Sequence, residues 1–250
     1  MRRPVITRPR LIDVVVNVLY GPRCTVCGER PATAGDGLCG TCREALTPSN
    51  EGRCPRCGVR LGPHVFVEKR CTSCRTLSLG VRSTAAVFSY AGAVREQVHA
   101  AKFRRDWTAS RRLVRAFVRG LSPGALPGEV DLVMSVPMYW VDRRLRGLHL
   151  SDELARGLAA KHALEYDAGL LRQVRPSRRQ FRLDPAERFR NVRGLFTTRR
   201  GADLRKRTVL LVDDVMTTGA TASECARMLR RAGARTVHGA VLARTEPAPG

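Results

Sequence analysis

Residues 209–221 read VLLVDDVMTTGAT, and this sequence predicts a buried strand, a turn and the start of a helix. The run 208–212 is apolar and β-branched, as is typical of a strand buried at the centre of a sheet. Asp213 and Asp214 follow this strand, and in open α/β sheets ligands bind at the carboxyl ends of the strands. The turn 217–221 then leads into a helix, where free backbone N–H groups and the helix dipole favour a phosphate.

The aspartate pair and the turn together predict a site for a ribose 5-phosphate. Two neighbouring carboxylates accept hydrogen bonds from the vicinal hydroxyls of a sugar, while the turn binds the phosphate on that sugar. Carboxylates repel pyrophosphate, so Mg²⁺ bound to substrate oxygens is expected with phosphoribosyl pyrophosphate. The residues assigned to the ribose hydroxyls are Asp213 and Asp214, and those assigned to the phosphate are Thr217, Thr218, Gly219, Ala220 and Thr221. No P-loop GK[ST] follows this turn and residues 81–250 contain no GxGxxG, which argues against ATP and dinucleotide sites in this part of the chain.

Strands and helices alternate from residue 81 onward. The strands are expected near 84–90, 131–136, 208–213 and 235–242, and the helices near 93–103, 108–119, 151–162 and 220–232. This alternation predicts an α/β fold, a parallel sheet with helices on both faces. We assign this domain to residues 81–245, with a flexible tail over 246–250 and a separate module over 1–80.

The module 1–80 contains four CxxC pairs. Two such knuckles can complete one tetrahedral Zn²⁺ site without an open position, so four predict two structural zinc sites in a double zinc-ribbon domain. The knuckles CTVCG and CPRCG alternate with CGTCR and CTSCR, and this internal repeat favours sequential pairing over an interleaved cross-brace. The predicted ligand sets are Cys24, Cys27, Cys39 and Cys42, and Cys54, Cys57, Cys71 and Cys74.

The net charge of +23 lies mostly on the second module. Residues 1–80 hold 13 basic and six acidic side chains, a net charge of +7, which leaves +16 on residues 81–250. A positive field of this size attracts phosphate-rich ligands and nucleic acid in a salt-dependent way. Genome base composition that favours arginine codons would give the same excess.

A short apolar stretch, 11–20, follows several arginines near the start of the sequence. Asp13 interrupts it and it is too short to span a bilayer, so we interpret it as a packing helix rather than as a signal peptide. No other segment reaches transmembrane length. We therefore expect a cytoplasmic protein without membrane insertion.

The string of apolar strand, aspartate pair and TTGAT resembles the signature of type I phosphoribosyltransferases. With four zinc knuckles before it, the chain resembles ComF-family proteins over nearly its whole length. Further matching positions are Tyr90, Arg95, Lys102, Phe103, Pro137, Arg143, Arg144, Arg146, Gly147, Gln180, Arg188 and Asn191. The resemblance implies a zinc-ribbon module fused to a phosphoribosyltransferase-like domain, linked in some bacteria to uptake of transforming DNA. It also implies substrate contacts from Lys102, Pro137, Arg143, Arg144 and Arg146.

One segment departs from the family pattern. Where such proteins usually read RGFNQ, residues 146–150 read RGLHL. The change removes an aromatic residue and two amides from a region expected to contact pyrophosphate, and it leaves His149 as a substitute hydrogen-bonding group.

Two functions from different classes remain open. The first is a phosphoribosyltransferase that transfers a pentosyl group to an unidentified acceptor, with stabilisation of the leaving pyrophosphate by the arginines of 143–146. The second is a non-catalytic protein that binds single-stranded DNA and retains the ribose phosphate pocket. The stretch 172–200 carries ten arginines together with Phe181, Phe189 and Phe196. It is a solvated loop, a lid over pyrophosphate, or a strip that stacks on bases.

Overall fold

The computed structural model describes residues 23–29, 32, 37–49, 52–62, 65, 71–75, 79–121, 126, 128–176 and 185–246. Contacts divide the chain into two compact units, Met1–Thr47 and Pro48–Gly250. The helix expected over 11–20 lies outside the described residues. In the described part of the chain, no helix is long and apolar enough to cross a membrane.

Both cysteine-rich segments are built on tight turns and short helices. In the first unit, α2 (Gly40–Ala45) begins directly after Cys39 and buries Cys42. In the second unit, an isolated antiparallel bridge joins Arg53 to Arg60, and α3 (Thr72–Arg75) follows in the same segment.

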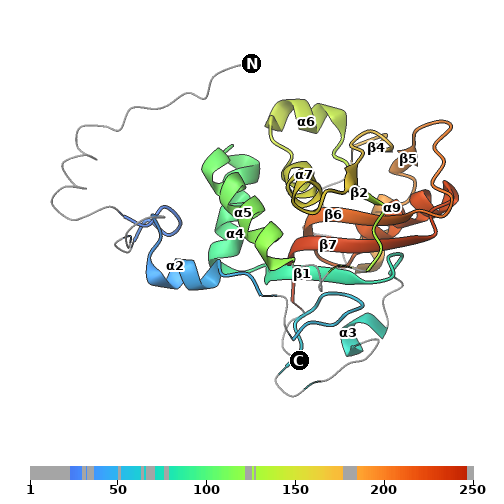
Figure 1. The fold of residues 1–250 in the computed structure, drawn as a ribbon. Coiled ribbons are helices and arrows are strands. Elements are labelled where there is room, and N and C mark those ends of the chain that lie inside the picture. The colour runs from blue at the N-terminus through green and yellow to red at the C-terminus, as the bar shows by residue number, and fades with distance from the viewer. Residues whose placement is uncertain are drawn as a thin grey trace. The chain divides into compact units, whose positions relative to one another are not determined.

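The main sheet of the second unit has five parallel strands in the order β1-β7-β6-β2-β3 (Figure 1). Their bounds are Thr84–Ser89 for β1, Leu132–Ser135 for β2, Glu165–Tyr166 for β3, Thr208–Met216 for β6 and Thr236–Arg244 for β7. The run 208–212 of the central strand β6 is buried throughout, as expected for a parallel strand covered on both faces. The predicted α/β fold is confirmed.

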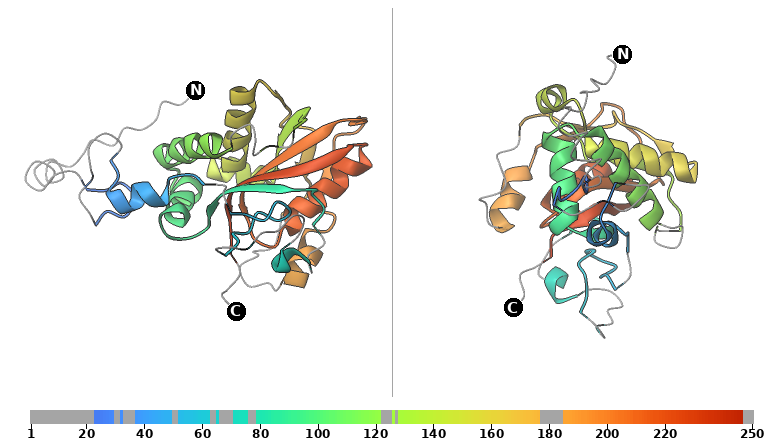
Figure 2. Two further views of the ribbon diagram at one scale, coloured as in Figure 1. Left: turned by 60° about the horizontal axis from the view of Figure 1, so that its bottom comes forward. Right: turned by 90° about the vertical axis from the view of Figure 1, so that its left-hand side faces the viewer.

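Helices cover the two faces because the crossovers run in opposite directions along the sheet. The connection from β1 to β2 contains α4 (Gly92–Phe103) and α5 (Trp107–Gly120), and that from β2 to β3 contains α6 (Trp140–Arg146) and α7 (Leu150–His162). The helix α9 (Ala220–Arg231) joins β6 to β7 in the reverse direction. Parallel crossovers are right-handed, so α7 and α9 lie on opposite faces (Figure 2).

A second, two-stranded antiparallel sheet packs beside α9. It consists of β4 (Leu171–Gln173) and β5 (Phe196–Thr198), and α8 (Pro185–Val192) lies between them in the chain. Both β5 and α8 contact α9.

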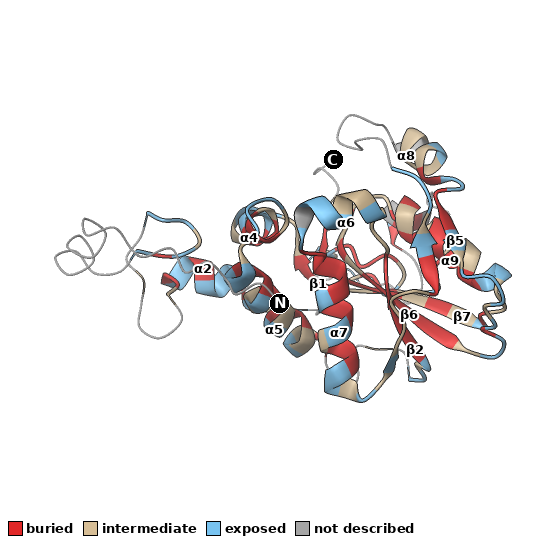
Figure 3. Ribbon diagram, turned by 90° about the horizontal axis from the view of Figure 1, so that it is seen from above, coloured by how far each residue is buried: buried red, intermediate tan, exposed pale blue. Residues whose placement is uncertain are grey.

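Buried residues gather where the helices meet the main sheet (Figure 3). On the α9 side, Val209 and Leu211 of β6 belong to one apolar cluster with Cys225 and Leu229 of α9. The four cysteines 54, 57, 71 and 74 belong to the same cluster. The second ribbon repeat therefore packs with the sheet, and the compact units divide between residues 47 and 48 instead of 80 and 81.

All eight elements expected around the sheet are present within two or three residues, with one change that matters for the site. The strand β6 continues through Met216, so Asp213 and Asp214 lie within the strand and not after its end. The sequence analysis did not predict α6, α8, β3, β4 or β5. The strands β3, β4 and β5 have only two or three residues each, too few for a recognisable alternation.

Candidate functional site

The aspartate pair lies where the sheet changes direction. The strand β6 pairs with β2 only as far as Val212, which lies opposite Ser135, whereas its pairing with β7 continues to Met216. The chain leaves β2 and β6 towards opposite faces at this point. In open α/β sheets this switch point is the usual place for a ligand.

Two side chains from separate helices and one backbone N–H of β6 contact the two carboxylates. Ser151 of α7 places Oγ 3.1 Å from Asp213 Oδ1 and 3.2 Å from Asp214 Oδ2. Lys102, in the last turn of α4, donates from Nζ to Asp214 Oδ1 at 2.6 Å. The backbone N–H of Asp214 donates to Asp213 Oδ1 at 2.8 Å. The site thus joins β6 to the end of α4 and the start of α7.

Asp213 ionises less readily than an ordinary carboxyl group. Burial and the neighbouring charge of Asp214 raise the pKa of Asp213 to about 7, although Lys102 opposes the rise. The single hydroxyl proton of Ser151 cannot be donated to both carboxylates at once. A proton on Asp213 allows Ser151 to accept from one carboxyl and donate to the other. Near neutral pH, Asp213 therefore exchanges a proton easily.

The turn after β6 requires a glycine at position 219. Gly219 has φ +80° and precedes the first turn of α9, whose N–H groups have no acceptor within the helix. A Cβ at Gly219 would lie 2.5 Å from side-chain atoms of Leu79 and Met216. Of the four neighbours predicted to bind phosphate, Thr217, Thr218 and Thr221 are half-buried and Ala220 is buried.

A buried arginine connects this turn to the second cysteine cluster. Arg244, the last residue of β7, donates from Nη1 to the carbonyl oxygens of Met216, at 2.9 Å, and of Thr217. Its Nε donates to the carbonyl oxygen of Cys57 at 3.0 Å. Arg244 was not predicted as a functional residue, because the sequence shows only an arginine directly after the apolar run 239–243. The backbone at the start of the turn after β6 is thus fixed to that of a cysteine knuckle.

The arginines predicted to contact substrate are carried by α6. Arg143 is half-exposed and donates from Nη2 to Asp152 Oδ2 at 3.3 Å. Arg144 is exposed, and the side chain of Arg146 lies outside the described part of the chain. Pro137 is half-buried and follows β2 on the same edge of the sheet as the aspartates.

Asp152, next to Ser151 in α7, accepts several hydrogen bonds. No sequence pattern predicted this role. Asp152 accepts hydrogen bonds from Tyr166 Oη, from Ser135 Oγ at 3.3 Å and from Arg156 Nε at 3.2 Å. Burial alone would raise the pKa of Asp152, but these donors and Arg143 hold it below its usual value. Asp152 therefore remains ionised and anchors the start of α7.

His149 lies in the segment 146–150, which reads RGLHL in place of RGFNQ, and is buried directly before α7. Burial lowers its pKa, although the charges of Asp214 and Asp152 oppose this. Its Nδ1 has no hydrogen-bond partner among the described residues. The RGLHL segment thus contains a neutral imidazole close enough to Asp214 for that charge to affect its pKa. Nδ1 of this ring is free to form a hydrogen bond as far as the described residues show.

The cysteines gather as the sequential pairing predicts. The sulfur atoms of 24, 27, 39 and 42 lie within 4.8 Å of one another, and so do those of 54, 57, 71 and 74. Four thiolates in a tetrahedral set are the preferred donors of structural Zn²⁺. Burial and the neighbouring thiols raise the pKa of Cys57, so four thiolates in the second cluster need a cation to offset their repulsion. Both clusters fit zinc-ribbon sites.

The arginine-rich stretch 172–200 is only partly described. Phe196 of β5 is buried, and Phe189 of α8 is partly buried against the α9 cluster. Both therefore pack in the protein and do not present a face for stacking on bases. Gln180 and Phe181 lie outside the described residues.

Comparisons with known proteins agree with both modules. A double zinc ribbon domain matches residues 15–76, and a phosphoribosyl transferase domain matches residues 146–248. The DNA utilization protein YhgH of Salmonella typhi is 30% identical over 228 residues, covering 89% of this chain and 96% of the relative. Competence protein F of Haemophilus influenzae is 24% identical over 226 residues, with the same two coverages of 89% and 96%.

Among solved structures, glutamine phosphoribosylpyrophosphate amidotransferase from B. subtilis matches 53% of this chain and 26% of its own, with 27% identity and a TM-score of 0.35. The two matched domains occur in the order expected from the cysteine pairs and the TTGAT turn. The relatives named above match along nearly their whole length. The chain belongs to the ComF family.

Proposed function

We propose that the carboxyl edge of the main sheet binds a ribose 5-phosphate group, either that of phosphoribosyl pyrophosphate or ribose 5-phosphate itself. The observation that carries the proposal is the position of Ser151 Oγ between Asp213 and Asp214. It holds the two carboxylates side by side, where the vicinal hydroxyls of a sugar can donate to both. The turn 217–221 follows directly and offers the N–H groups of α9 to the 5-phosphate.

In the proposed reaction, a nucleophile attacks the anomeric carbon of phosphoribosyl pyrophosphate. The new bond forms as the bond from that carbon to the pyrophosphate oxygen breaks, and pyrophosphate leaves with the electron pair. Arg143, Arg144 and Arg146 are assigned to the charge of the leaving group. The carboxylates and the substrate oxygens are donors that suit Mg²⁺, which when bound would offset their mutual repulsion.

Lys102 and His149 have supporting roles in this proposal. Lys102 pairs with Asp214 and so keeps two adjacent carboxylates from excluding an anionic substrate. His149 is neutral, and its Nδ1 has no hydrogen-bond partner in the described part of the chain, so it supplies the hydrogen-bonding group that the missing amides of the family pattern would otherwise provide.

A second candidate function is binding of single-stranded DNA. It is favoured by the names of the relatives, which refer to DNA utilization and to competence, and by the net charge of +16 on residues 81–250. Because Phe189 and Phe196 are packed against the protein, binding would rest on arginine contacts with phosphates. Its affinity for an oligonucleotide should then fall steeply with salt, and a flat salt response would exclude it.

Two assays separate binding from transfer. Ribose 5-phosphate cannot lose pyrophosphate, so its equilibrium binding tests the pocket alone. Release of pyrophosphate from phosphoribosyl pyrophosphate in the presence of amines or nucleobases tests transfer. Binding without release would favour a non-catalytic protein that retains the pocket, whereas release abolished by Asp213→Asn would support the enzyme.

A further inference from the structure

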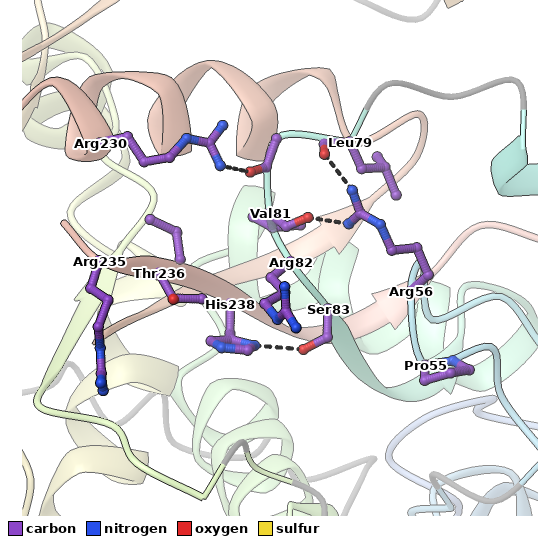
Figure 4. Close-up of a pocket in the computed structure, with 12 residues that line it drawn as sticks. Pro55, Arg56, Leu79, Val81, Arg82, Ser83, Arg230, Arg235, Thr236 and His238 are labelled. Carbon is purple, nitrogen blue, oxygen red and sulfur yellow. Dashed lines mark hydrogen bonds between the residues drawn. The ribbon is translucent and has the colours of Figure 1, made fainter. Parts of the chain in front are cut away.

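A basic cavity lies on the edge of the sheet opposite to the aspartates. It has a volume of about 690 Å³ and opens at the amino ends of β1 and β7 (Figure 4). Ligand pockets in proteins typically occupy about 300–1,000 Å³, so a molecule of nucleotide size fits. The lining comes from three segments of the second unit: 55–56 in the second ribbon repeat, 79–83 before β1, and 230–238 from the end of α9 into β7.

The charged side chains in the described lining of the cavity are all arginines. Among the described residues, four arginines, at positions 56, 82, 230 and 235, line the cavity, and no aspartate or glutamate does. Arg235 is paired with Glu129 at 2.9 Å, outside the lining. Among the described residues, Arg82 and Arg230 form no ion pair. In the described part of the chain, therefore, no carboxylate neutralises the positive charge that Arg82 and Arg230 bring to the cavity.

Hydrogen bonds hold the floor of the cavity in place. Arg56 donates from Nη2 to the carbonyl of Leu79 at 2.6 Å and from Nη1 to that of Val81. The backbone N–H of Gly80 donates to Ser223 Oγ of α9 at 3.0 Å. A Cβ at Gly80 would lie 2.7 Å from the backbone oxygen of Ser223, so this close contact requires glycine. The segment 79–83 is thus fixed against α9 before any ligand binds.

A polar pair adds hydrogen-bonding groups beside Arg82. Ser83 Oγ and His238 Nδ1 lie 2.7 Å apart, which fixes the imidazole in the cavity wall (Figure 4). Burial and the charge of Arg82 lower the pKa of His238, so the ring is neutral at pH 7. Exposed Pro55 supplies an apolar surface next to these groups.

We propose that this cavity binds the phosphate of a nucleoside phosphate, through Arg82 and Arg230, with Ser83 and His238 beside the sugar. Guanidinium groups recognise phosphate oxygens through paired hydrogen bonds, and here two of them lack a carboxylate partner. The ligand is either a free nucleotide or a nucleotide unit of single-stranded DNA, since both present the same phosphate ester. This site is separate from the proposed ribose phosphate pocket and does not depend on it.

Thymidine 5′-monophosphate is a suitable probe because it lacks the 2′-hydroxyl and so offers no vicinal diol to Asp213 and Asp214. We expect it to bind the full chain, and Arg82→Glu to weaken this binding at least tenfold. The matched control is Arg115→Glu, which makes the same charge change at an exposed position of α5. Binding should be unchanged in that control and in the Asp213→Asn/Asp214→Asn double variant.

Oligothymidylate distinguishes the two sources of the ligand. If it binds more tightly than the mononucleotide and the difference falls with salt, the cavity holds a unit of a DNA strand. If the two bind equally, the cavity holds a free nucleotide. Failure of both probes to bind, or equal binding by the wild type and the Arg82→Glu variant with an unchanged thermal unfolding midpoint, would overturn the proposal.

Discussion

Arg244 Nε donates a hydrogen bond of 3.0 Å to the carbonyl oxygen of Cys57. The same guanidinium binds the carbonyl of Met216 at 2.9 Å, so one buried cation bridges a knuckle of the second cysteine cluster and the turn that follows the aspartates. A further hydrogen bond joins the segment after the second cysteine cluster to α9, from the Gly80 N–H to Ser223 Oγ, and Ser223 donates from both its N–H and its Oγ to the carbonyl oxygen of Gly219. The second ribbon repeat therefore supports the proposed phosphate site directly.

Replacement of Arg244 should destabilise the second unit. In Arg244→Met, carbonyls of the knuckle and the turn lose a charged donor while they stay buried, and we expect a loss of about 3 kcal/mol in the free energy of unfolding. Denaturant unfolding measures this. Arg115→Met, at an exposed position, should change the value by less than about 0.5 kcal/mol. Equal values for the two variants would mean that the bridge carries no stability.

Loss of the second metal site should affect the phosphate turn, whereas loss of the first should not. We expect metal analysis to find two zinc ions per chain and only one in Cys54→Ser or in Cys27→Ser. Ribose 5-phosphate binding should weaken in Cys54→Ser, because Arg244 links that cluster to the turn. Cys27 belongs to a different compact unit, and its variant should bind as the wild type does. Equal weakening in both would contradict this coupling.

Gly219 should be required both for its positive φ and for the lack of space for a Cβ, and one control variant separates the two effects. Gly219→Ala places a Cβ 2.5 Å from Leu79 and Met216 and also requires φ +80°. Gly147→Ala requires φ +70° with no atom within 4 Å of the Cβ. The control should cost about 1 kcal/mol of stability, and Gly219→Ala clearly more, together with a loss of phosphate affinity. If both variants behave alike, the close contacts at Gly219 are unimportant.

The ionisation of Asp213 should make stability depend on pH. Its pKa is about 7 in the folded protein, above the ordinary value of 3.8. The folded state therefore holds more protons than the unfolded state between these values, and this group's contribution to the free energy of unfolding falls as pH rises across that window. Asp213→Asn should remove this component, which thermal unfolding at a series of pH values would show.

Ligand affinity should change with pH in the opposite direction. A ribose hydroxyl needs an ionised acceptor, so ribose 5-phosphate should bind more tightly as pH rises from about 6 to about 8. The phosphate of the ligand also ionises near pH ~6, but that contribution persists in Asp213→Asn. A steeper rise in the wild type than in the variant is expected. Parallel curves would show that Asp213 does not titrate in the site.

The sequence predicts best those features that depend on a short run of neighbouring residues. The buried run of β6 and the TTGAT turn predicted the sheet and the region of the site, and the repeat of knuckles predicted both cysteine clusters. Ser151, Asp152 and Arg244 could not be assigned, because their contacts join residues up to 187 positions apart. The extent of β6 was also missed, since charged residues at 213–214 resemble the end of a strand.

Binding of a ribose phosphate at Asp213 and Asp214 can be measured by calorimetric titration with phosphoribosyl pyrophosphate and Mg²⁺. We expect saturable binding to the wild-type chain and its loss in the Asp213→Asn/Asp214→Asn double variant, with the thermal unfolding of that variant showing a folded protein. Binding of equal affinity by the wild type and the double variant, or no binding of phosphoribosyl pyrophosphate or ribose 5-phosphate by the wild type, would contradict it.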